Sequence, residues 1–290
     1  MLVSTTNAHF SAHYDSFEAT KILVEAGFTA LDCSMMDMKL FPFTDDYKET
    51  AKAMRAYAEE HGVRFNQSHA PFGSYEQHIN EILPNIERAF EASALLGIGA
   101  MVIHPTQRTG YYGREEAIYK ENVEIYRSLA PLAKKYGVKI AIENMWSRDP
   151  MLGRVCDAIC ADPRELARMY DELADPEAFT ICLDLGHVAL CGRRPEDAIR
   201  IIGGQRLGAL HVHDVVDNKD LHVISGLGII KWDEVCRALA EIDYSGELTL
   251  EADDTYNYFE EAMWRPTARF MAERAKSLAN KIEEYKAEKI

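Results

Sequence analysis

The sequence predicts a (β/α)8 TIM barrel of the α/β class, formed as a single domain by residues 1–290. Three observations predict this fold: eight short apolar segments alternate with helical segments, glycine commonly follows the helices, and polar residues follow the apolar segments. The rival fold, an open doubly wound sheet, usually carries a glycine-rich phosphate loop after its first strand. The segment STTNAHF is not such a loop, so the barrel is favoured.

The eight predicted strands are short and rich in Val, Ile and Leu, as fully buried parallel strands are. Glycine after a helix, as in VEAGF and YGVKI, supplies the left-handed residue that turns the chain back towards the sheet. We expect the strands at residues 2–6, 29–34, 63–68, 100–104, 138–143, 180–184, 207–212 and 247–251.

Helical segments occupy the intervals between these strands. We expect them at residues 15–26, 46–61, 76–96, 115–136, 162–173, 194–202, 231–242 and 260–286. Pro84 is expected to kink or divide the third of them, and Pro266 to mark a break or a start in the last. Asp162 and Pro163 have the residue types that favour an N-cap and a first helical position.

Composition limits the partners and the compartment. The formal net charge of −15 repels phosphate backbones, which argues against nucleic acid as the main partner. The sequence has neither a signal-peptide pattern nor an apolar run of about 18 residues, so we expect no membrane segment. The six cysteines form no regular framework, which favours reduced thiols and a cytoplasmic protein. The acidic surface and apolar helices would allow a homo-oligomer.

Four predicted strands end on residues of metal-ligand type: Glu143, Asp184, His211 and Glu251. In a barrel the carboxyl ends of the strands converge, and two Glu, one Asp and one His suit a divalent cation such as Mn, Mg, Co or Zn. Taken singly, each could be a helix cap or a hydrogen-bonded core residue. Together they predict a metal site, because buried carboxylates so close together would repel unless a cation neutralised them.

Further residues of ligand type lie at other strand ends and in one loop: His69, His104, Asp220 and His222. Each could bind the substrate, support the metal ligands or hold further Zn.

Two long loops follow the predicted strands that end near His104 and Glu143, and such loops commonly build lids and substrate pockets. Trp146 and Arg148 are candidate substrate-binding residues in the second loop. The loop arginines could recognise a phosphate or carboxylate, or form salt bridges on the rim: Arg108, Arg114, Arg148 and Arg154.

The ordered motifs SHAP, VIHP, IEN, CLDLGH, HVHD, DLHVISGLG and LTLE resemble those of the xylose-isomerase-like TIM barrel superfamily. That superfamily holds sugar isomerases and epimerases and the endonuclease IV type of abasic-site endonuclease, and the resemblance covers nearly the whole chain. It implies that His187 contacts the substrate. It also implies one divalent ion held by Glu143, Asp184, His211 and Glu251, with His211 preferred to His213 because the family pattern His-x-x-Asp runs from His211 to Asp214.

The endonuclease members hold three zinc ions with nine ligands, and residues of the right type stand at every matching motif position of this chain. They are His69, His104, Glu143, Asp184, His187, His211, Asp220, His222 and Glu251. Many sugar-acting members retain these residues as well. The sugar epimerases often present an arginine shortly after His-x-x-Asp, and the segment VVDNKD has none.

The main hypothesis is therefore a metal-dependent isomerase or epimerase of a sugar or sugar derivative, with a small-molecule carbohydrate as partner. The ion would polarise the carbonyl and stabilise an enediolate, while Glu143 and Glu251 would remove and return the proton. Two alternatives stay open. One is a keto-inositol (inosose) dehydratase, in which the same proton abstraction is followed by loss of a hydroxyl. The other is a zinc-dependent abasic-site endonuclease.

Overall fold

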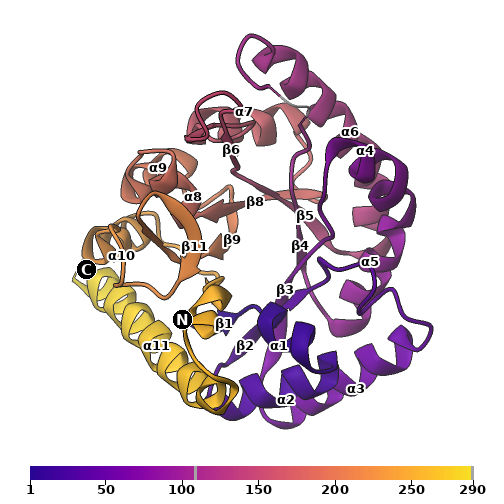
Figure 1. The fold of residues 1–290 in the computed structure, drawn as a ribbon, viewed down its shortest axis with the longest axis vertical. Helices are drawn as coiled ribbons and strands as arrows, with labels where there is room; N and C mark the ends of the chain where they lie inside the picture. The colour runs from indigo at the N-terminus through magenta and orange to yellow at the C-terminus, as the bar shows by residue number, and fades with distance from the viewer. Residues whose placement is uncertain (108–109, 289–290) are drawn as a thin grey trace.

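The structure is a computed structural model that describes residues 1–107 and 110–288. Its centre is a ring of eight parallel strands, seen end-on in Figure 1. Six form one sheet in the order β2-β3-β4-β5-β8-β9, and β1 pairs with β12. Two isolated parallel bridges, Thr6 with Asp32 and Val212 with Leu250, close the ring. The strands are β1 Val3–Thr5, β2 Ala30–Ser34, β3 Arg64–His69, β4 Ala100–Ile103, β5 Lys139–Glu143, β8 Phe179–Asp184, β9 Leu207–His211 and β12 Leu248–Leu250.

In the part of the chain that the structure describes, eight helices surround this barrel, each packed against the next, and the contact between the last and the first completes the outer ring. They are α2 Ser16–Ala26, α3 Tyr47–Glu60, α5 Leu83–Leu96, α6 Glu115–Tyr136, α7 Pro163–Leu173, α9 Pro195–Ile202, α10 Trp232–Glu241 and α11 Trp264–Ala287. The predicted TIM barrel is thus confirmed, and every predicted strand overlaps an observed one.

The predicted helix boundaries have local causes in the structure. Asp162 accepts a hydrogen bond from the backbone N–H of Arg164 (2.8 Å), and Pro163 is the first residue of α7, as expected. Pro84 lies in the first turn of α5, directly after a π-helical segment, η1 His78–Ile82, and the short helix α4 Tyr75–Gln77. The segment 76–96 is therefore divided, as Pro84 predicts.

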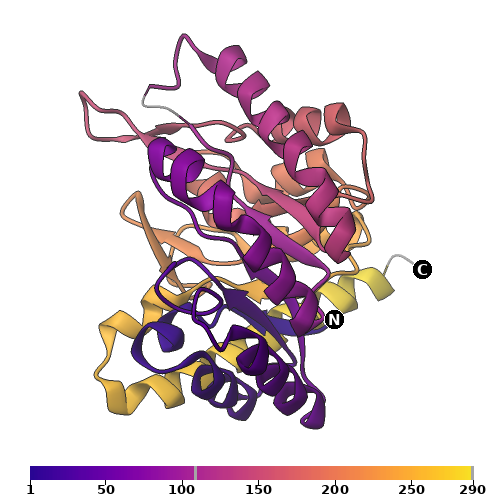
Figure 2. The ribbon, with the colours of Figure 1, turned by 90° about the vertical axis from the view of Figure 1, so that its right-hand side faces the viewer.

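Several shorter elements were not predicted. Helix α1 (Ala8–His13) follows β1, and α8 (Leu185–Leu190) follows β8. The long segment after β5 contains the hairpin β6 Trp146–Arg148 and β7 Val155–Asp157, and the segment after β9 contains β10 Asp214–Val216 and β11 Lys219–Val223. The 3-10 helices η2 (Asp253–Tyr258) and η3 (Glu261–Met263) follow β12. In Figure 2 both hairpins project at one end of the barrel, opposite the C-terminus.

Residues inside the barrel are small or polar, while the strand residues between them face the helices and join the large apolar core. Val102, Ala141, Cys182 and Ala209 form a separate interior cluster. Because successive strand residues point to opposite faces, the residue two positions after each of these also points inward. Those positions are His104, Glu143, Asp184 and His211, so strand alternation places four predicted site residues at the open end of the interior.

The described residues contain no helix that is both long enough and apolar enough to span a lipid bilayer.

Candidate metal centre and pocket

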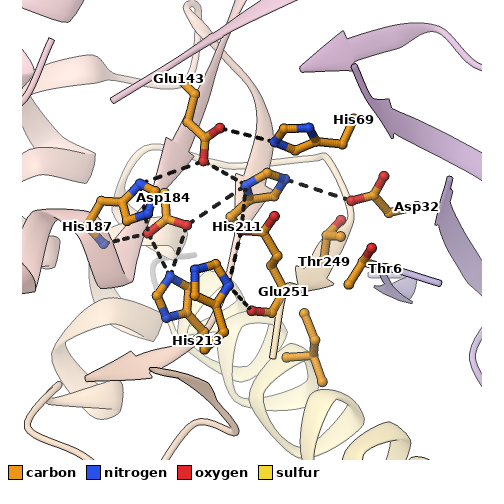
Figure 3. A network of polar contacts seen from close by, with 12 residues as sticks. Thr6, Asp32, His69, Glu143, Asp184, His187, His211, His213, Thr249 and Glu251 are labelled. Carbon is orange, nitrogen blue, oxygen red and sulfur yellow. Dashed lines mark hydrogen bonds and ion pairs between the residues drawn. The ribbon is translucent and has the colours of Figure 1, made fainter. Parts of the chain in front are cut away.

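The four predicted metal ligands converge at the carboxyl ends of β5, β8, β9 and β12 (Figure 3). Each offers one atom, and these atoms all lie within 4.8 Å of one another. The Nδ1 atom of His211 is the centre of the group: it lies 2.8 Å from Oε1 of Glu143, 3.0 Å from Oε2 of Glu251 and 3.8 Å from Oδ2 of Asp184. The convergence expected from the sequence is present.

A second group adjoins the first through the same glutamate. Oε2 of Glu143 lies 2.8 Å from Nε2 of His104 and 3.6 Å from Nε2 of His69, and the two imidazole nitrogens are 3.0 Å apart. His69 donates its Nδ1–H to the backbone carbonyl of Ala70 (2.8 Å), which leaves its Nε2 lone pair facing Glu143. Two histidines and a carboxylate oxygen thus form a further set of ligand type.

A third group lies on the other side of the central one and consists of His187, His213, Asp220 and His222. Asp220 is its centre, with Nε2 of His222 at 3.3 Å and Nε2 of His187 at 3.6 Å. The indole Nε1 of Trp146 donates to Oδ2 of Asp220 (3.0 Å), so the β6–β7 hairpin contacts the site. His213 stacks on His222 and lies 3.1 Å from Asp184.

Backbone carbonyls orient two histidines of this third group as they orient His69. His187 donates its Nδ1–H to the carbonyl of Asn144 (2.9 Å), and His222 donates its own to the carbonyl of Glu251 (2.9 Å). In both rings Nε2 therefore faces Asp220, which is the orientation that a metal ligand would require.

The backbone at Gly186 leaves the space that His213 of the third group occupies. Gly186 lies so near the imidazole of His213 that a Cβ atom there would meet the ring at 2.0 Å, so the Gly of the DLGH motif is required by this contact.

The site has strong internal electrostatics. Although burial alone would raise it, the neighbouring imidazoles of His211 and His104 hold the pKa of Glu143 well below its usual range. Burial would also raise the pKa of Glu251, but the neighbouring imidazole of His211 has the larger effect and lowers it. Although burial would lower the pKa of His187, the carboxylates of Asp184 and Asp220 raise it to about 10. The lowered pKa values of Glu143 and Glu251 favour their ionised forms, which attract positive charge.

The residues of the central group fit a divalent cation. Glu143, Asp184 and His211 are buried, and Glu251 is only 6% exposed. Three carboxylates therefore lie close together in the barrel interior with little access to solvent. Such crowding of like charges in a barrel interior needs a compensating cation. The donor set of carboxylate oxygens and one imidazole suits Mn, Mg, Co or Zn.

The metal-ligand groups open onto a pocket of about 400 Å³, a size typical of small-ligand sites. Ten of the eleven predicted site residues either line it or belong to the groups beneath it. Residues that the sequence did not indicate also line it: Met36, Phe72, Met145, Asp253 and Asp254. The side chains of Phe72 and Trp146 give the pocket an apolar, aromatic wall beside the polar floor.

Arg148 lies outside this pocket. It is exposed at the end of β6, where its guanidinium donates to the carbonyl of Gly153 (2.8 Å), and it lines a neighbouring hollow together with Arg114. Arg154 lines another surface hollow, next to Cys191. Arg108 is outside the described residues. None of the three described arginines therefore lies on the wall of the metal pocket.

The loop after β11 is held by one buried aspartate, Asp214, which the sequence marked only as the end of His-x-x-Asp. Its Oδ1 accepts from the backbone N–H groups of Val215 (3.0 Å) and Ile230 (3.1 Å). Its Oδ2 accepts from the N–H of Gly226 (2.8 Å) and from the indole of Trp232 (2.8 Å). This carboxylate ties β10 to the chain that follows β11, the strand that carries Asp220 and His222.

Comparison with known proteins places this architecture. Residues 20–274 match the family model described as xylose isomerase-like TIM barrel. A probable endonuclease 4 of Acholeplasma laidlawii is 28% identical over 220 residues, which cover 66% of this chain and 69% of that protein. An uncharacterized protein of Methanocaldococcus jannaschii is 27% identical over 192 residues, 63% of this chain, and the match spans only 62% of that protein's length.

Solved structures share the fold over almost the full length. A D-tagatose 3-epimerase-like protein superposes with a TM-score of 0.75 at 19% identity, covering 100% of this chain and 99% of the other. The IOLI protein with a binding zinc atom gives a TM-score of 0.75 at 20% identity, covering 98% and 99%. At these identities the likeness establishes the fold alone.

Proposed function

Because the chain belongs to the xylose isomerase-like TIM barrel family, we propose that it is a divalent-metal-dependent isomerase or epimerase of a sugar or sugar derivative. One observation carries the proposal: two glutamates, Glu143 and Glu251, approach the same imidazole nitrogen from two strands, and both line a pocket of single-sugar size. Solved structures with this fold include proteins described as D-psicose 3-epimerase with D-tagatose and as D-tagatose 3-epimerase-like, which supports the same reaction class.

The residues divide into binding and proton-transfer roles. Glu143, Asp184, His211 and Glu251 would hold the cation, which would supply polarisation of the substrate carbonyl. The neighbouring imidazoles lower the pKa of Glu143 and of Glu251, which favours the carboxylate form that would take the proton from the carbon beside that carbonyl. The other glutamate would return the proton, to the neighbouring carbon in an isomerase or to the opposite face in an epimerase.

The pocket walls would orient the sugar. His187 lies on the wall with its Nδ1–H fixed by Asn144, so its Nε2 is available to a substrate oxygen. Phe72 and Trp146 offer apolar surface to the C–H face of a sugar ring. His69, His104, Asp220 and His222 line the same pocket and would contact substrate hydroxyls or further ions.

The first test is the metal content of the purified protein by mass spectrometry, followed by incubation with ketoses, aldoses and inososes in D2O. About one divalent ion per chain, and deuterium incorporated beside the carbonyl, are the expected results. Glu143→Gln and Glu251→Gln should each abolish incorporation. The matched control is Glu247→Gln, at the opposite end of β12, where Glu247 pairs with the exposed Arg64. Normal exchange in both site variants would refute the proton-transfer assignment, and a dione product would identify the dehydratase instead.

A second candidate, a zinc-dependent abasic-site endonuclease, is favoured by one specific observation. The central group is flanked by two more groups of ligand type, centred on Glu143 and Asp220, so the site has residues for more than one ion. The net charge of −15 opposes binding to DNA. Two or three Zn per chain, with chelator-sensitive cleavage of a synthetic abasic duplex, would establish this candidate. One ion per chain and an intact duplex would eliminate it.

A further inference from the structure

The two nitrogens of His211 face opposite kinds of surroundings. Nδ1 faces the carboxylates of Glu143, Asp184 and Glu251. Nε2 is buried and has no hydrogen-bond partner among the described residues, and a dashed line in Figure 3 joins it to Asp32 on β2. The distance from Nε2 to Oδ2 of Asp32 is 3.8 Å, within ion-pair range but longer than a hydrogen bond.

Asp32 is itself an unusual residue for its position. It is fully buried in the barrel interior, below the metal-ligand groups, and its Oδ1 has no hydrogen-bond partner among the described residues. Its Oδ2 accepts one hydrogen bond, from the side-chain amide of Gln67 (3.2 Å). Gln67 in turn accepts from the hydroxyl of Thr249 (3.2 Å), so the carboxylate is held from β3 and β12. A buried carboxylate with so few partners destabilises a fold unless a cationic or N–H group faces it.

The other oriented histidines of the site use a different partner. His69, His187 and His222 each donate Nδ1–H to a neutral backbone carbonyl and turn Nε2 towards the carboxylates. His211 has the reverse orientation: its Nδ1 faces the carboxylates of the central group, and its Nε2 faces the carboxylate of Asp32. A metal-bound imidazole carries its proton on the nitrogen away from the metal, so for His211 that N–H would point at Asp32.

We propose that Asp32 is a positioning residue for the central cation: it holds the proton of His211 on Nε2 and thereby keeps the Nδ1 lone pair directed at Glu143, Asp184 and Glu251. A charged partner stabilises the N–H more than a carbonyl does and makes the imidazole a stronger ligand. Asp32 does not touch the pocket, so it acts only through His211. The inference rests on the proposed metal-dependent function.

The test compares Zn2+ affinity, measured by competition with a chromophoric chelator, in the wild type, Asp32→Asn and Asp32→Ser. Both variants remove the charge, and asparagine also keeps an acceptor for the amide of Gln67. Both should bind Zn2+ more weakly by about 10- to 100-fold, the usual cost of losing such an outer partner. Metal-free Asp32→Asn should unfold at no lower urea concentration than the wild type, because an uncompensated buried carboxylate has been removed while the acceptor for Gln67 remains.

The matched control is Ser68→Ala, which removes a buried hydrogen bond to Ser93 (2.8 Å) on the helix-facing side of β3. It should lower the urea concentration at the midpoint of unfolding and leave Zn2+ affinity unchanged. The visible spectrum of the Co2+-loaded protein gives a second readout, which should shift in the Asp32 variants and stay constant in the control.

The outcomes separate the two proposals. Equal Zn2+ affinity in the wild type and both Asp32 variants would overturn the role of Asp32 but leave the metal centre in place. Weaker binding accompanied by an equal shift in the Ser68→Ala control would also overturn it, because a general packing defect would then explain the loss. Wild-type protein that binds no divalent ion would overturn the metal centre and the role of Asp32 together.

Discussion

Asp214→Asn should destabilise the protein strongly. Each carboxylate oxygen of Asp214 accepts two hydrogen bonds, from Val215 and Ile230 at Oδ1 and from Gly226 and Trp232 at Oδ2. Asparagine has one oxygen and one NH2 group, so in either orientation two donors, at least one of them buried, lose their acceptor and face another donor. No rotation of the side chain restores both pairs.

The magnitude follows from these contacts. Two lost hydrogen bonds to a charged group, at about 1.5–3 kcal/mol each, give a loss of roughly 3–6 kcal/mol. An unfolding entropy of about 2.1 cal/mol/K per residue gives roughly 0.6 kcal/mol/K for 290 residues. The midpoint of thermal unfolding should therefore fall by about 5–10 °C.

The assay is urea and thermal unfolding of the metal-free protein, with Asp217→Asn as the matched control. Asp217 lies in the same β10–β11 hairpin but is exposed, and its φ of 54° suits asparagine. The control should change the free energy of unfolding by less than about 0.5 kcal/mol. Equal stability of Asp214→Asn and the control would refute the idea that one carboxylate holds this loop.

Two further predictions concern metal and pH. Removing the ion with a chelator should lower the midpoint of thermal unfolding, because a ligand at 1,000 times its dissociation constant stabilises the folded protein by about 4 kcal/mol. If the chelator leaves the midpoint of metal-loaded protein unchanged, the metal site is contradicted. Burial of His9, with His13 nearby, lowers the pKa of His9 to about 4. As the pH falls, His9 is therefore protonated in the unfolded chain before it is protonated in the folded protein. Its contribution to stability is complete above about pH 6.5 and is lost towards pH 4, by at most about 3 kcal/mol. His9→Phe, which retains the ring contact with Tyr256, should lose less stability than the wild type between pH 7.5 and pH 5 in thermal unfolding, and equal losses would argue against this assignment.

The barrel and the central ligand group were predictable because both depend on short-range patterns. A short apolar run that ends in a polar residue marks a buried strand and its open end, which was enough to identify Glu143 and Glu251. Strand alternation then fixes their direction, since Ala141 and Ala209 are interior residues and Glu143 and His211 follow each by two positions.

Asp32 could not be found in this way. It stands alone inside the apolar run FTALDCSMM, and its partners Gln67 and His211 belong to other strands. The strand itself ends on Ser34, so no ligand at its open end indicated which residues face the interior. Only the closed barrel brings these three side chains together.

The two hairpins also depend on tertiary contacts rather than on local pattern. The short strand β7 is tied to the chain after α8 by a two-pronged pair between Asp157 and Arg193, with both distances 2.7 Å. The strand β6 is tied to the site by Trp146, which donates to Asp220. Three-residue strands carry too little alternation to be recognised, so this segment was predicted only as a long loop.

The shared position of Glu143 means that the ligand groups cannot act independently. Its Oε1 faces His211, and its Oε2 faces His104. An ion at the central group would fix the plane of this carboxylate and withdraw part of its charge, so the affinity of the histidine pair for a second ion would depend on whether the first is present. By thermodynamic reciprocity the second ion would change the affinity for the first by the same factor. A zinc titration in which a second ion binds should therefore show coupled binding of the two ions rather than a sum of separate isotherms.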